Sequence, residues 1–193
     1  MHIITRRAGL PVLVMALAAM MISGCSAQSA DDGTFWNGLR VNALERNPPT
    51  TLAELVDRAD FIVIGKVLAI ETGPEDKSAD GAGPIIQTVA LVAGVDDVVK
   101  GTLDAEEVKI VMVPAGPVDL VVKEKPTGNK AMFFLVQRSD GYYACVSLSG
   151  LVEDTSVGLV TVVDPVQSEL ASGESNSQKT FDDLVREVRS LVK

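Results

Sequence analysis

The sequence predicts a mainly β domain with flanking helices, built as a small antiparallel barrel of about five to seven strands. Three observations favour this class. Short runs rich in β-branched residues recur between Gly, Pro and Asp-Gly signals, and these runs do not alternate with long helices. Helix-capping patterns precede and follow the strand-rich region, so we expect a short helix before the barrel and an amphipathic helix after it. The domain is assigned to residues 51–193.

The first helix and the first strand follow each other closely. Thr51 and Glu54 have the spacing of a capping box, in which a hydroxyl and a carboxylate accept hydrogen bonds from free backbone N–H groups. We expect this helix to end at Asp60. Residues 61–70 are almost wholly apolar and β-branched, apart from Gly65 and the lysine after it. This pattern predicts a long strand that bends or bulges at the glycine, as suits a curved barrel.

Further strands are expected at short intervals along the chain. A loop rich in Gly, Pro, Asp and Ser over residues 71–83 separates the first strand from the second. The remaining strands are expected at residues 84–99, 108–113, 118–122, 131–136, 142–149 and 159–163. Asp140-Gly141 lies between two of these runs and predicts a hairpin, because glycine accepts a positive φ.

Two adjacent aromatic residues and the C-terminal segment indicate how the core is divided. Phe133 and Phe134 point to opposite sides of one strand, so we expect the barrel interior to hold one ring and a covering helix to bury the other. Thr180 has the position of an N-cap, and the apolar residues from Phe181 to Val192 recur at helical spacing. This terminal helix requires a core to cover.

The first 24 residues have the organisation of a signal peptide. Residues 1–7 carry two positive charges and no acid, and residues 8–22 form an apolar run of 15 residues. Because a helix needs roughly 20 residues to cross the bilayer core, a cleaved leader is favoured over a permanent transmembrane anchor. The arginines at positions 6 and 7 suit both the general and the twin-arginine export routes.

The apolar run is followed immediately by Ile22-Ser23-Gly24-Cys25, which resembles the lipobox of bacterial lipoproteins. The resemblance implies that the processing enzymes recognise Ile22, Ser23 and Gly24. It also implies that a diacylglyceryl group is attached to the sulfur of Cys25 and that cleavage occurs before this residue. Since two or more acyl chains hold a protein firmly, we expect a lipoprotein anchored in the lipid of the cell membrane, on its extracytoplasmic face. An ordinary secretory signal at the same position is the alternative.

Residues 25–50 are expected to connect the lipid to the domain as a flexible tether. They mix Ser, Gln, Asp, Asn and Gly without a sustained period. Within them, four residues are more apolar than a spacer requires. These are Phe35, Trp36, Leu39 and Val41. Such residues either dock on the domain or lie at the lipid interface, and we favour docking.

The domain itself carries a family resemblance. The stretch from Leu52 to Val67 resembles the opening of a loose group of uncharacterised exported bacterial proteins, whose domains are OB-type barrels. Shorter similarities lie at residues 98–101, 128–135 and 150–152. The resemblance implies a small extracytoplasmic OB-like barrel, and it brings no established activity to this chain.

The charge balance argues against one large class of partners. The chain of 193 residues has a formal net charge of −9. Removal of residues 1–24 takes away two of its 17 basic residues and none of its 26 acidic residues, which leaves −11. Because nucleic-acid binding depends on Lys and Arg that neutralise phosphates, we expect no nucleic-acid partner.

Removal of the leader also removes the only histidine. Catalysis by Ser-His-Asp or Cys-His, and zinc sites that need His, then cannot be assembled within the chain. We expect Cys145 to be packed and inert, because free Cys behaves as a small hydrophobe. Acidic pairs occur at residues 75–76, 96–97, 106–107, 153–154 and 182–183. None has the ligand spacing of a calcium loop, so we interpret them as solvated surface charge and expect no metal, cofactor or catalytic residue.

These observations favour a non-catalytic binding or accessory module of the cell envelope, whose ligand or protein partner the sequence does not specify. The alternative is a hydrolase acting on a cell-wall substrate, since paired carboxyl groups perform acid and base catalysis without His. Two carboxyl groups about 5 to 9.5 Å apart in a pocket would favour the hydrolase, and carboxyl groups scattered over a convex surface would favour binding. A large exposed apolar patch would favour an accessory subunit.

Overall fold

The computed structural model describes residues 47–76, 84–147, 150–156, 158–161 and 179–193. The predicted leader, Cys25 and the tether up to residue 46 lie outside the described residues. The helices are α2 (Leu52–Arg58), α3 (Val118–Val121) and α5 (Phe181–Leu191). The strands are β1 (Phe61–Thr72), β2 (Val89–Lys100), β3 (Glu107–Met112), β4 (Lys130–Gln137), β5 (Tyr143–Cys145), β6 (Leu151–Thr155) and β7 (Gly158–Thr161).

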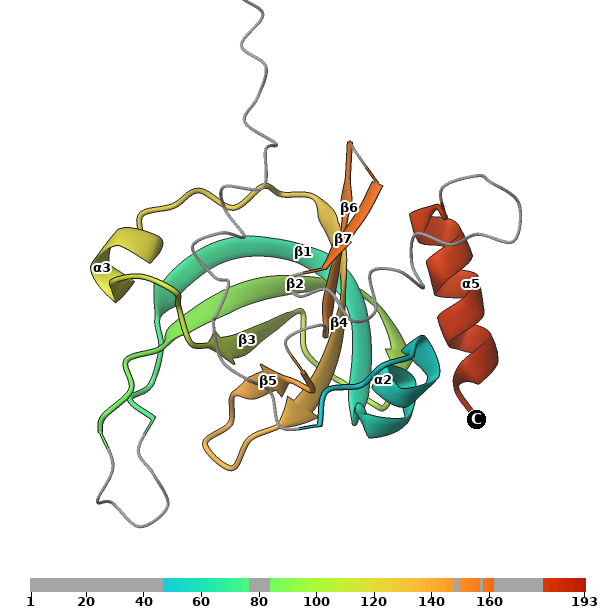
Figure 1. Ribbon diagram of the computed structural model, residues 1–193, viewed down its shortest axis with the longest axis horizontal. Coiled ribbons are helices and arrows are strands. Elements are labelled where there is room, and N and C mark those ends of the chain that lie inside the picture. Colours follow the sequence, from blue (N-terminus) through green and yellow to red (C-terminus); the bar gives the residue numbers. More distant parts are fainter. Residues whose placement is uncertain (1–46, 77–83, 148–149, 157, 162–178) are drawn as a thin grey trace, which may run out of the picture. The chain divides into compact units, whose positions relative to one another are not determined.

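Five strands close a barrel in the order β1-β2-β3-β5-β4, and β4 pairs back onto β1 (Figure 1). β6 pairs with β4 and β7 pairs with β6, which adds two strands to the sheet. The mainly β class, the small barrel and the two flanking helices are therefore confirmed. The barrel is mixed, however, because β3 and β5 pair in parallel, whereas the sequence analysis predicts an antiparallel barrel. This parallel pair is possible because a long connection through α3 and β4 separates the two strands.

α2 begins where the sequence predicts. The Thr51 hydroxyl accepts a hydrogen bond from the N–H of Glu54 at 3.2 Å. The Glu54 carboxylate accepts from the N–H of Thr50 at 2.8 Å, one residue before the partner that a capping box uses. The helix ends at Arg58, two residues before the predicted Asp60.

β1 bends at the predicted glycine. Its register against β2 shifts between Ile64 and Gly65, which is the irregularity expected of a bulge. A Cβ atom on Gly65 would lie 1.8 Å from the carbonyl oxygen of Gly94, so only glycine fits where the two strands approach this closely. The bulge lets β1 pair with β2 along one edge and with β4 along the other.

Two predicted strands differ from the structure. The strand predicted at residues 118–122 is instead the helix α3, Val118–Val121, with Val122 as its C-cap, because Pro117 precedes a helical turn that buries Val121 at the barrel core. The strand predicted at residues 142–149 is shorter, since β5 ends at Cys145. Residues 148–149 of that prediction lie outside the described residues.

β6 is a strand that the sequence analysis does not predict. It continues the pairing along β4 after an interruption: the N–H of Val146 donates to the carbonyl of Phe134, and the N–H of Phe134 donates to the carbonyl of Gly150. β5 and β6 therefore act as two parts of one interrupted partner of β4. β7 occupies the predicted position at residues 159–163 as far as Thr161, and the rest of that range lies outside the described residues.

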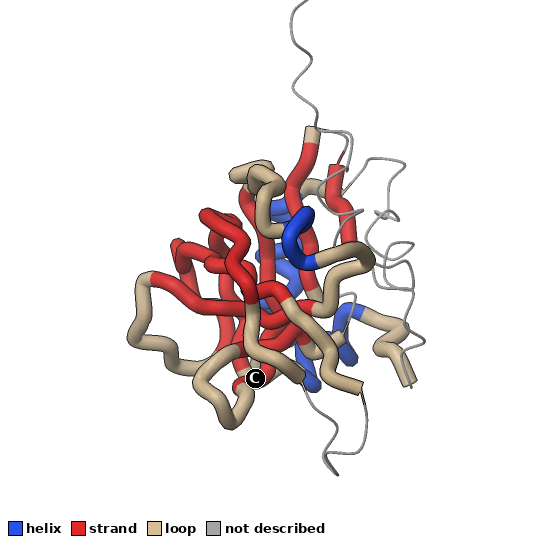
Figure 2. The backbone as a smooth tube through the Cα atoms, turned by 90° about the vertical axis from the view of Figure 1, so that its left-hand side faces the viewer, coloured by secondary structure: helices blue, strands red, loops and turns tan. Residues whose placement is uncertain are grey.

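Apolar side chains form two clusters, one on each side of the strand that carries the paired phenylalanines. Phe133 belongs to the inner cluster, which includes residues of β1, β2, β3 and β4. Figure 2 shows these strands as curved segments of one sheet. Phe134 lies on the outer side, packed with residues of α2 and α5. Both rings are fully buried, so the predicted division of the core is confirmed. The outer cluster comprises Leu52, Leu55, Val56, Ala59, Ile62, Ile64, Met132, Phe134, Val152, Leu159, Phe181, Leu184 and Val188.

α5 is capped and docked as predicted. Thr180 and Asp183 form a full capping box, with the side chain of each accepting from the backbone N–H of the other. The Lys130 ammonium lies 5.1 Å from the centre of the Phe181 ring, a cation–π contact between the helix and β4. These contacts fix the start of α5 against the sheet.

Candidate functional site

Two connections of the barrel are joined by an ion pair. The β1–β2 connection is described at residues 73–76 and 84–88, and the β4–β5 turn comprises residues 138–142. Arg138 Nη1 lies 3.5 Å from Asp76 Oδ2. The backbone of Asp76 exchanges two hydrogen bonds of 2.9 Å with Ile86, which closes the base of the β1–β2 connection. The ion pair thus links two segments that are 62 residues apart in the sequence.

The β4–β5 turn holds Arg138 in place. Gly141 has φ of +85°. This is the left-handed conformation on which the hairpin prediction at Asp140-Gly141 depends. Asp140 accepts hydrogen bonds from the Arg138 guanidinium at 3.0 and 3.2 Å and from the N–H of Tyr142 at 3.2 Å. These bonds, with that to Arg138 the largest cause, lower the pKa of Asp140. The hydrogen bond to Asp140 likewise raises the pKa of Arg138.

A second ion pair crosses the outer face of β2. Lys109 Nζ on β3 lies 2.7 Å from Glu71 Oε2 on β1, and β2 runs between these two strands. The hydrogen bond to Glu71 is the largest cause that raises the pKa of Lys109, and attraction to the Glu71 charge adds to it. Tyr143 pairs with Ile110 in the parallel register of β5 and β3, so the preceding residues, Tyr142 and Lys109, hold neighbouring positions. This register brings the second ion pair beside the β4–β5 turn.

We call the set of Glu71, Asp76, Lys109, Arg138, Asp140 and Tyr142 the interloop surface. Its two cations are each hydrogen-bonded to a carboxylate, and its three carboxylates give a local net charge of −1. Such paired groups offer hydrogen-bond donors and acceptors in fixed positions. Because both cations already have carboxylate partners, they offer no unpaired positive charge to a phosphate. Tyr142 is half-buried and adds an amphipathic ring at the edge.

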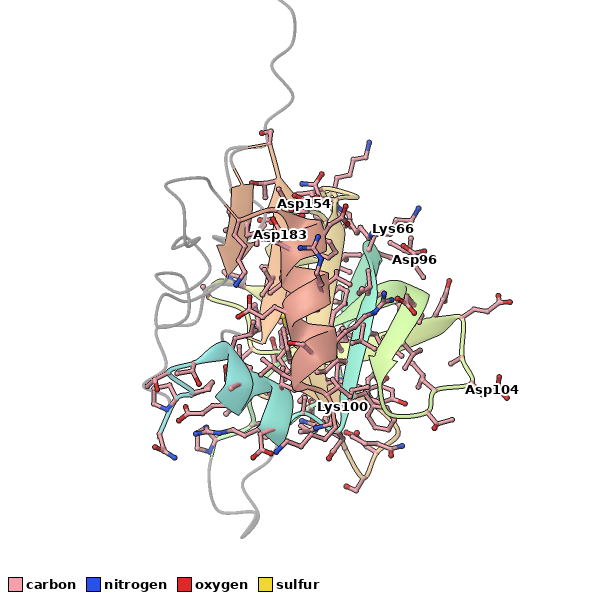
Figure 3. The ribbon with its side chains drawn as sticks, turned by 90° about the vertical axis from the view of Figure 1, so that its right-hand side faces the viewer. Lys66, Asp96, Lys100, Asp104, Asp154 and Asp183 are labelled. Carbon is pink, nitrogen blue, oxygen red and sulfur yellow. The ribbon has the colours of Figure 1, made fainter. Side chains whose placement is uncertain are left out.

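A second candidate site is a cavity of about 360 Å³ beside the start of α5. Its lining comprises Lys130, Asp154, Thr155, Ser156, Gly158, Lys179, Thr180, Phe181 and Asp182. Figure 3 labels Asp154 and the capping residue Asp183 near this end of the helix. Lys179 pairs with Glu187 on α5. Two acidic residues, Asp154 and Asp182, therefore line one cavity.

The structure tests only some of the residues that the sequence analysis selects. Ile22, Ser23, Gly24 and Cys25 lie outside the described residues, so the lipidation site stays a prediction. Cys145 packs against the barrel core, and burial raises the pKa of its thiol to about 12, in keeping with the predicted inert cysteine.

The interpretation of the acidic pairs as solvated surface charge is wrong for Glu153, which is 1% exposed and accepts a hydrogen bond from the Thr127 hydroxyl. Members of other pairs are held in specific contacts. Asp76 pairs with Arg138, Asp97 lies 2.6 Å from Arg189 on α5, and Asp183 belongs to a capping box. Within the described ranges, no group of three or more His, Cys, Asp or Glu side chains is arranged to hold a metal ion.

The sequence analysis does not select the interloop surface. The Asp-Gly signal indicates the β4–β5 turn, but nothing local to Arg138 points to Asp76 as its partner. Lys109 and Glu71 are also brought together only by the pairing of β1, β2 and β3. Three-dimensional pairing of strands is therefore the signal that reveals this surface.

Comparison with protein-family models, with curated proteins and with solved structures gives no match to the chain. Among the helices that the structure describes, none combines the length and the apolar character needed to cross a membrane.

Proposed function

We propose that the chain is a lipid-anchored protein of the cell envelope that acts as a non-catalytic binding module. The leader and the Ile22-Ser23-Gly24-Cys25 sequence support the anchor, because both have the order that lipoprotein processing requires. Lipid on Cys25 would hold the barrel at the extracytoplasmic face of the cell membrane. The net charge of −11 would keep the barrel clear of anionic headgroups.

The interloop surface is the proposed ligand site. OB-type barrels bind oligonucleotides and oligosaccharides on the face of strands 2 and 3, between the loops that follow strands 1 and 4. The corresponding connections here are those joined by Asp76 and Arg138. This link is the observation that carries the proposal, because it holds both loops beside one polar surface.

An oligosaccharide is the proposed ligand class. The acidic chain disfavours a nucleic acid, and the cations of the interloop surface already have carboxylate partners. Sugar hydroxyls can donate to Glu71 and Asp76 and accept from Lys109 and Arg138 without leaving a charge unpaired. The ring of Tyr142 offers an apolar surface for the sugar ring.

Binding is tested with soluble fragments of cell-wall glycan, followed by chemical-shift changes of the barrel amides. We expect shifts confined to residues around the β1–β2 and β4–β5 connections, and at least tenfold weaker binding in Arg138→Gln and Tyr142→Ala. Arg186→Gln is the matched control, since Arg186 lies on α5, where it pairs with Asp183, and belongs to neither connection of the interloop surface. Equal binding by Arg138→Gln and Arg186→Gln would remove the interloop surface as the ligand site.

The anchor is tested separately in cells. We expect Cys25→Ser to accumulate as unprocessed precursor or to leave the membrane fraction, and mass spectrometry of the parent chain to find acylated Cys25 as its first residue. An unmodified amino terminus at any other residue would contradict the lipoprotein assignment.

A carboxylate-based hydrolase is the second candidate function. The observation in its favour is that Asp154 and Asp182 line the same cavity as Lys130 and Lys179. If this cavity hydrolyses a cell-wall glycan, Asp154→Asn and Asp182→Asn each abolish release of reducing ends while leaving the melting temperature within about 2 °C. Asp104→Asn, on an exposed connection, is the control.

A further inference from the structure

The base of the β1–β2 connection places an exposed isoleucine beside the Asp76–Arg138 ion pair. The backbones of Asp76 and Ile86 exchange both of their hydrogen bonds, so these residues lie directly opposite each other in an antiparallel bridge. Directly opposite residues project their side chains to the same face, with Cβ atoms about 4.5–5.5 Å apart. The side chain of Ile86 therefore lies next to that of Asp76, whose Oδ2 pairs with Arg138.

Hydrogen bonds fix this arrangement to the barrel. The N–H of Gly73 donates to the carbonyl of Thr88 at 2.9 Å. The buried hydroxyl of Thr88 donates to the carbonyl of Pro74. These bonds carry the pairing of β1 and β2 outward to the bridge between Asp76 and Ile86. A site on such a base is already in place before a ligand arrives, which lowers the entropy that binding costs.

The polar atoms beside Ile86 have unused hydrogen-bonding capacity. Arg138 donates from Nε and Nη2 to Asp140 and from Nη1 to Asp76. A guanidinium carries five N–H groups, so one on each of Nη1 and Nη2 has no partner among the described residues. Over the same part of the chain, Asp76 Oδ1 accepts no hydrogen bond, and this side chain is 44% exposed. A ligand can therefore reach an acceptor and two donors here.

Ile86 adds an apolar contact to these polar atoms. Its side chain is 43% exposed although the backbone holds it in place. A single exposed apolar residue does not indicate a site. Here, however, it lies on the same face as the free oxygen of Asp76, so the two together suit a ligand group that joins a donor to a small apolar end.

An N-acetylated amine is such a group. Its amide is planar and trans, so the carbonyl oxygen points away from the N–H while the methyl group lies on the same side as the N–H. When the N–H donates to Asp76 Oδ1, the methyl group is brought towards Ile86. The free N–H groups of Arg138 can then donate to a neighbouring hydroxyl oxygen of the same sugar. A hydroxyl in place of the acetylated amine can bond to Asp76 but leaves Ile86 uncovered.

We propose that the interloop surface recognises an oligosaccharide whose sugars carry N-acetyl groups, and that Ile86 selects these groups. The inference rests on the proposed function, because it specifies the ligand of the same surface. Burial of one methyl group changes affinity about fourfold. We therefore expect at least a fourfold preference for an N-acetylated oligosaccharide over one with hydroxyl groups at the same carbons.

Three tetrasaccharides with the same backbone and linkage test this preference by titration calorimetry of the full chain, extracted from membranes in detergent. They are N-acetylchitotetraose, its form with free amines, and cellotetraose, which has hydroxyl groups instead. We expect N-acetylchitotetraose to bind at least fourfold more tightly than cellotetraose. Ile86→Ala should abolish this preference, and Ile86→Val, which keeps a branched apolar side chain, should retain most of it.

Ile85→Ala is the matched control. Ile85 lies on the same connection and is 56% exposed, but it is not the residue opposite Asp76. The preference should survive in this variant. Because both isoleucines are exposed, each alanine variant should melt within about 2 °C of the parent, so a change in binding does not reflect unfolding.

The other outcomes separate this inference from the proposed function. Equal affinity of the parent for N-acetylchitotetraose and cellotetraose would overturn the inference and leave glycan binding intact. Equal loss of preference in Ile85→Ala and Ile86→Ala would also overturn it. Tightest binding of the free-amine form, weakened by salt, would replace acetyl recognition by attraction to the acidic surface. If none of the three glycans bound, the proposed function itself would be rejected.

Discussion

β1 and β2 approach each other closely at Gly65, so one added methyl group tests how these two barrel strands pair. In Gly65→Ala, the new Cβ would lie 1.8 Å from the carbonyl oxygen and 2.9 Å from the carbonyl carbon of Gly94. Both obstacles are backbone atoms, so no side chain can rotate away. The strands must separate at the bulge, where β1 also pairs with β4. Overpacking costs about 1–3 kcal/mol, and we expect about 3 kcal/mol here because backbone hydrogen bonds are strained as well.

Thermal unfolding, followed by circular dichroism, measures this cost. For a chain of this size about 1 kcal/mol lowers the melting temperature by about 2–4 °C, so Gly65→Ala should melt about 6–12 °C below the parent. Two other glycines separate the causes. Gly116→Ala meets no atom within 4 Å and should be neutral or stabilise by about 0.4–1 kcal/mol. Gly128→Ala also meets open space, but its φ of +72° predicts a cost of about 1–2 kcal/mol. Equal melting temperatures of Gly65→Ala and Gly116→Ala would refute the close approach of β1 and β2 at Gly65.

Three further predictions follow from the core, the thiol and the turn. Phe134→Ala removes a fully buried ring beneath α2 and α5 and should cost about 3–5 kcal/mol in denaturant unfolding, whereas a loss below about 1 kcal/mol would contradict the packing. Burial raises the pKa of Cys145 from 9.0 to about 12, so its thiolate fraction at pH 8 falls about a thousandfold. Alkylation of the folded chain by iodoacetamide should slow accordingly, and equal rates in folded and urea-unfolded protein would count against this. Arg138→Gln should raise the pKa of Asp140 towards its ordinary value, measured by carboxyl NMR. Because the folded pKa is lowered, the stabilisation from Asp140 is present at neutral pH and is lost as the pH falls through that lowered value; an unchanged titration in the variant would exclude the Arg138 hydrogen bond as its cause.

Local patterns account for the parts of the fold that the sequence predicts correctly. Thr180 and Asp183 lie three residues apart, so their reciprocal hydrogen bonds need only the first turn of a helix. The φ of Gly141 likewise depends on one turn. Alternation along a single strand sends Phe133 and Phe134 to opposite clusters, whatever their partners are. In each case, the residues that determine the structure lie only a few positions apart in the sequence.

The errors arise where packing overrides a local preference. Residues 118–122 are rich in β-branched side chains and read as a strand, but the turn after Pro117 places Val121 in the barrel core. The long strand predicted at residues 142–149 ends at Cys145. Beyond it, the carbonyl of Phe134 accepts from the N–H of Val146, whereas the N–H of Phe134 donates to the carbonyl of Gly150, so the partner of β4 is interrupted between these two residues. Propensity alone does not contain either constraint.

One edge of the interloop surface could not be predicted because it lies beside the shortest seam of the barrel. β3 and β5 share only the register pairs Ile110 with Tyr143 and Val111 with Ala144, and they run parallel. Parallel pairing needs a distant crossover, so no hairpin signal marks it in the sequence. The register of this seam brings Tyr142 from the turn and Lys109 from β3 to neighbouring positions. A ligand held by both would therefore bind the closed barrel in preference to an opened one, and its binding would stabilise the seam with the fewest register pairs.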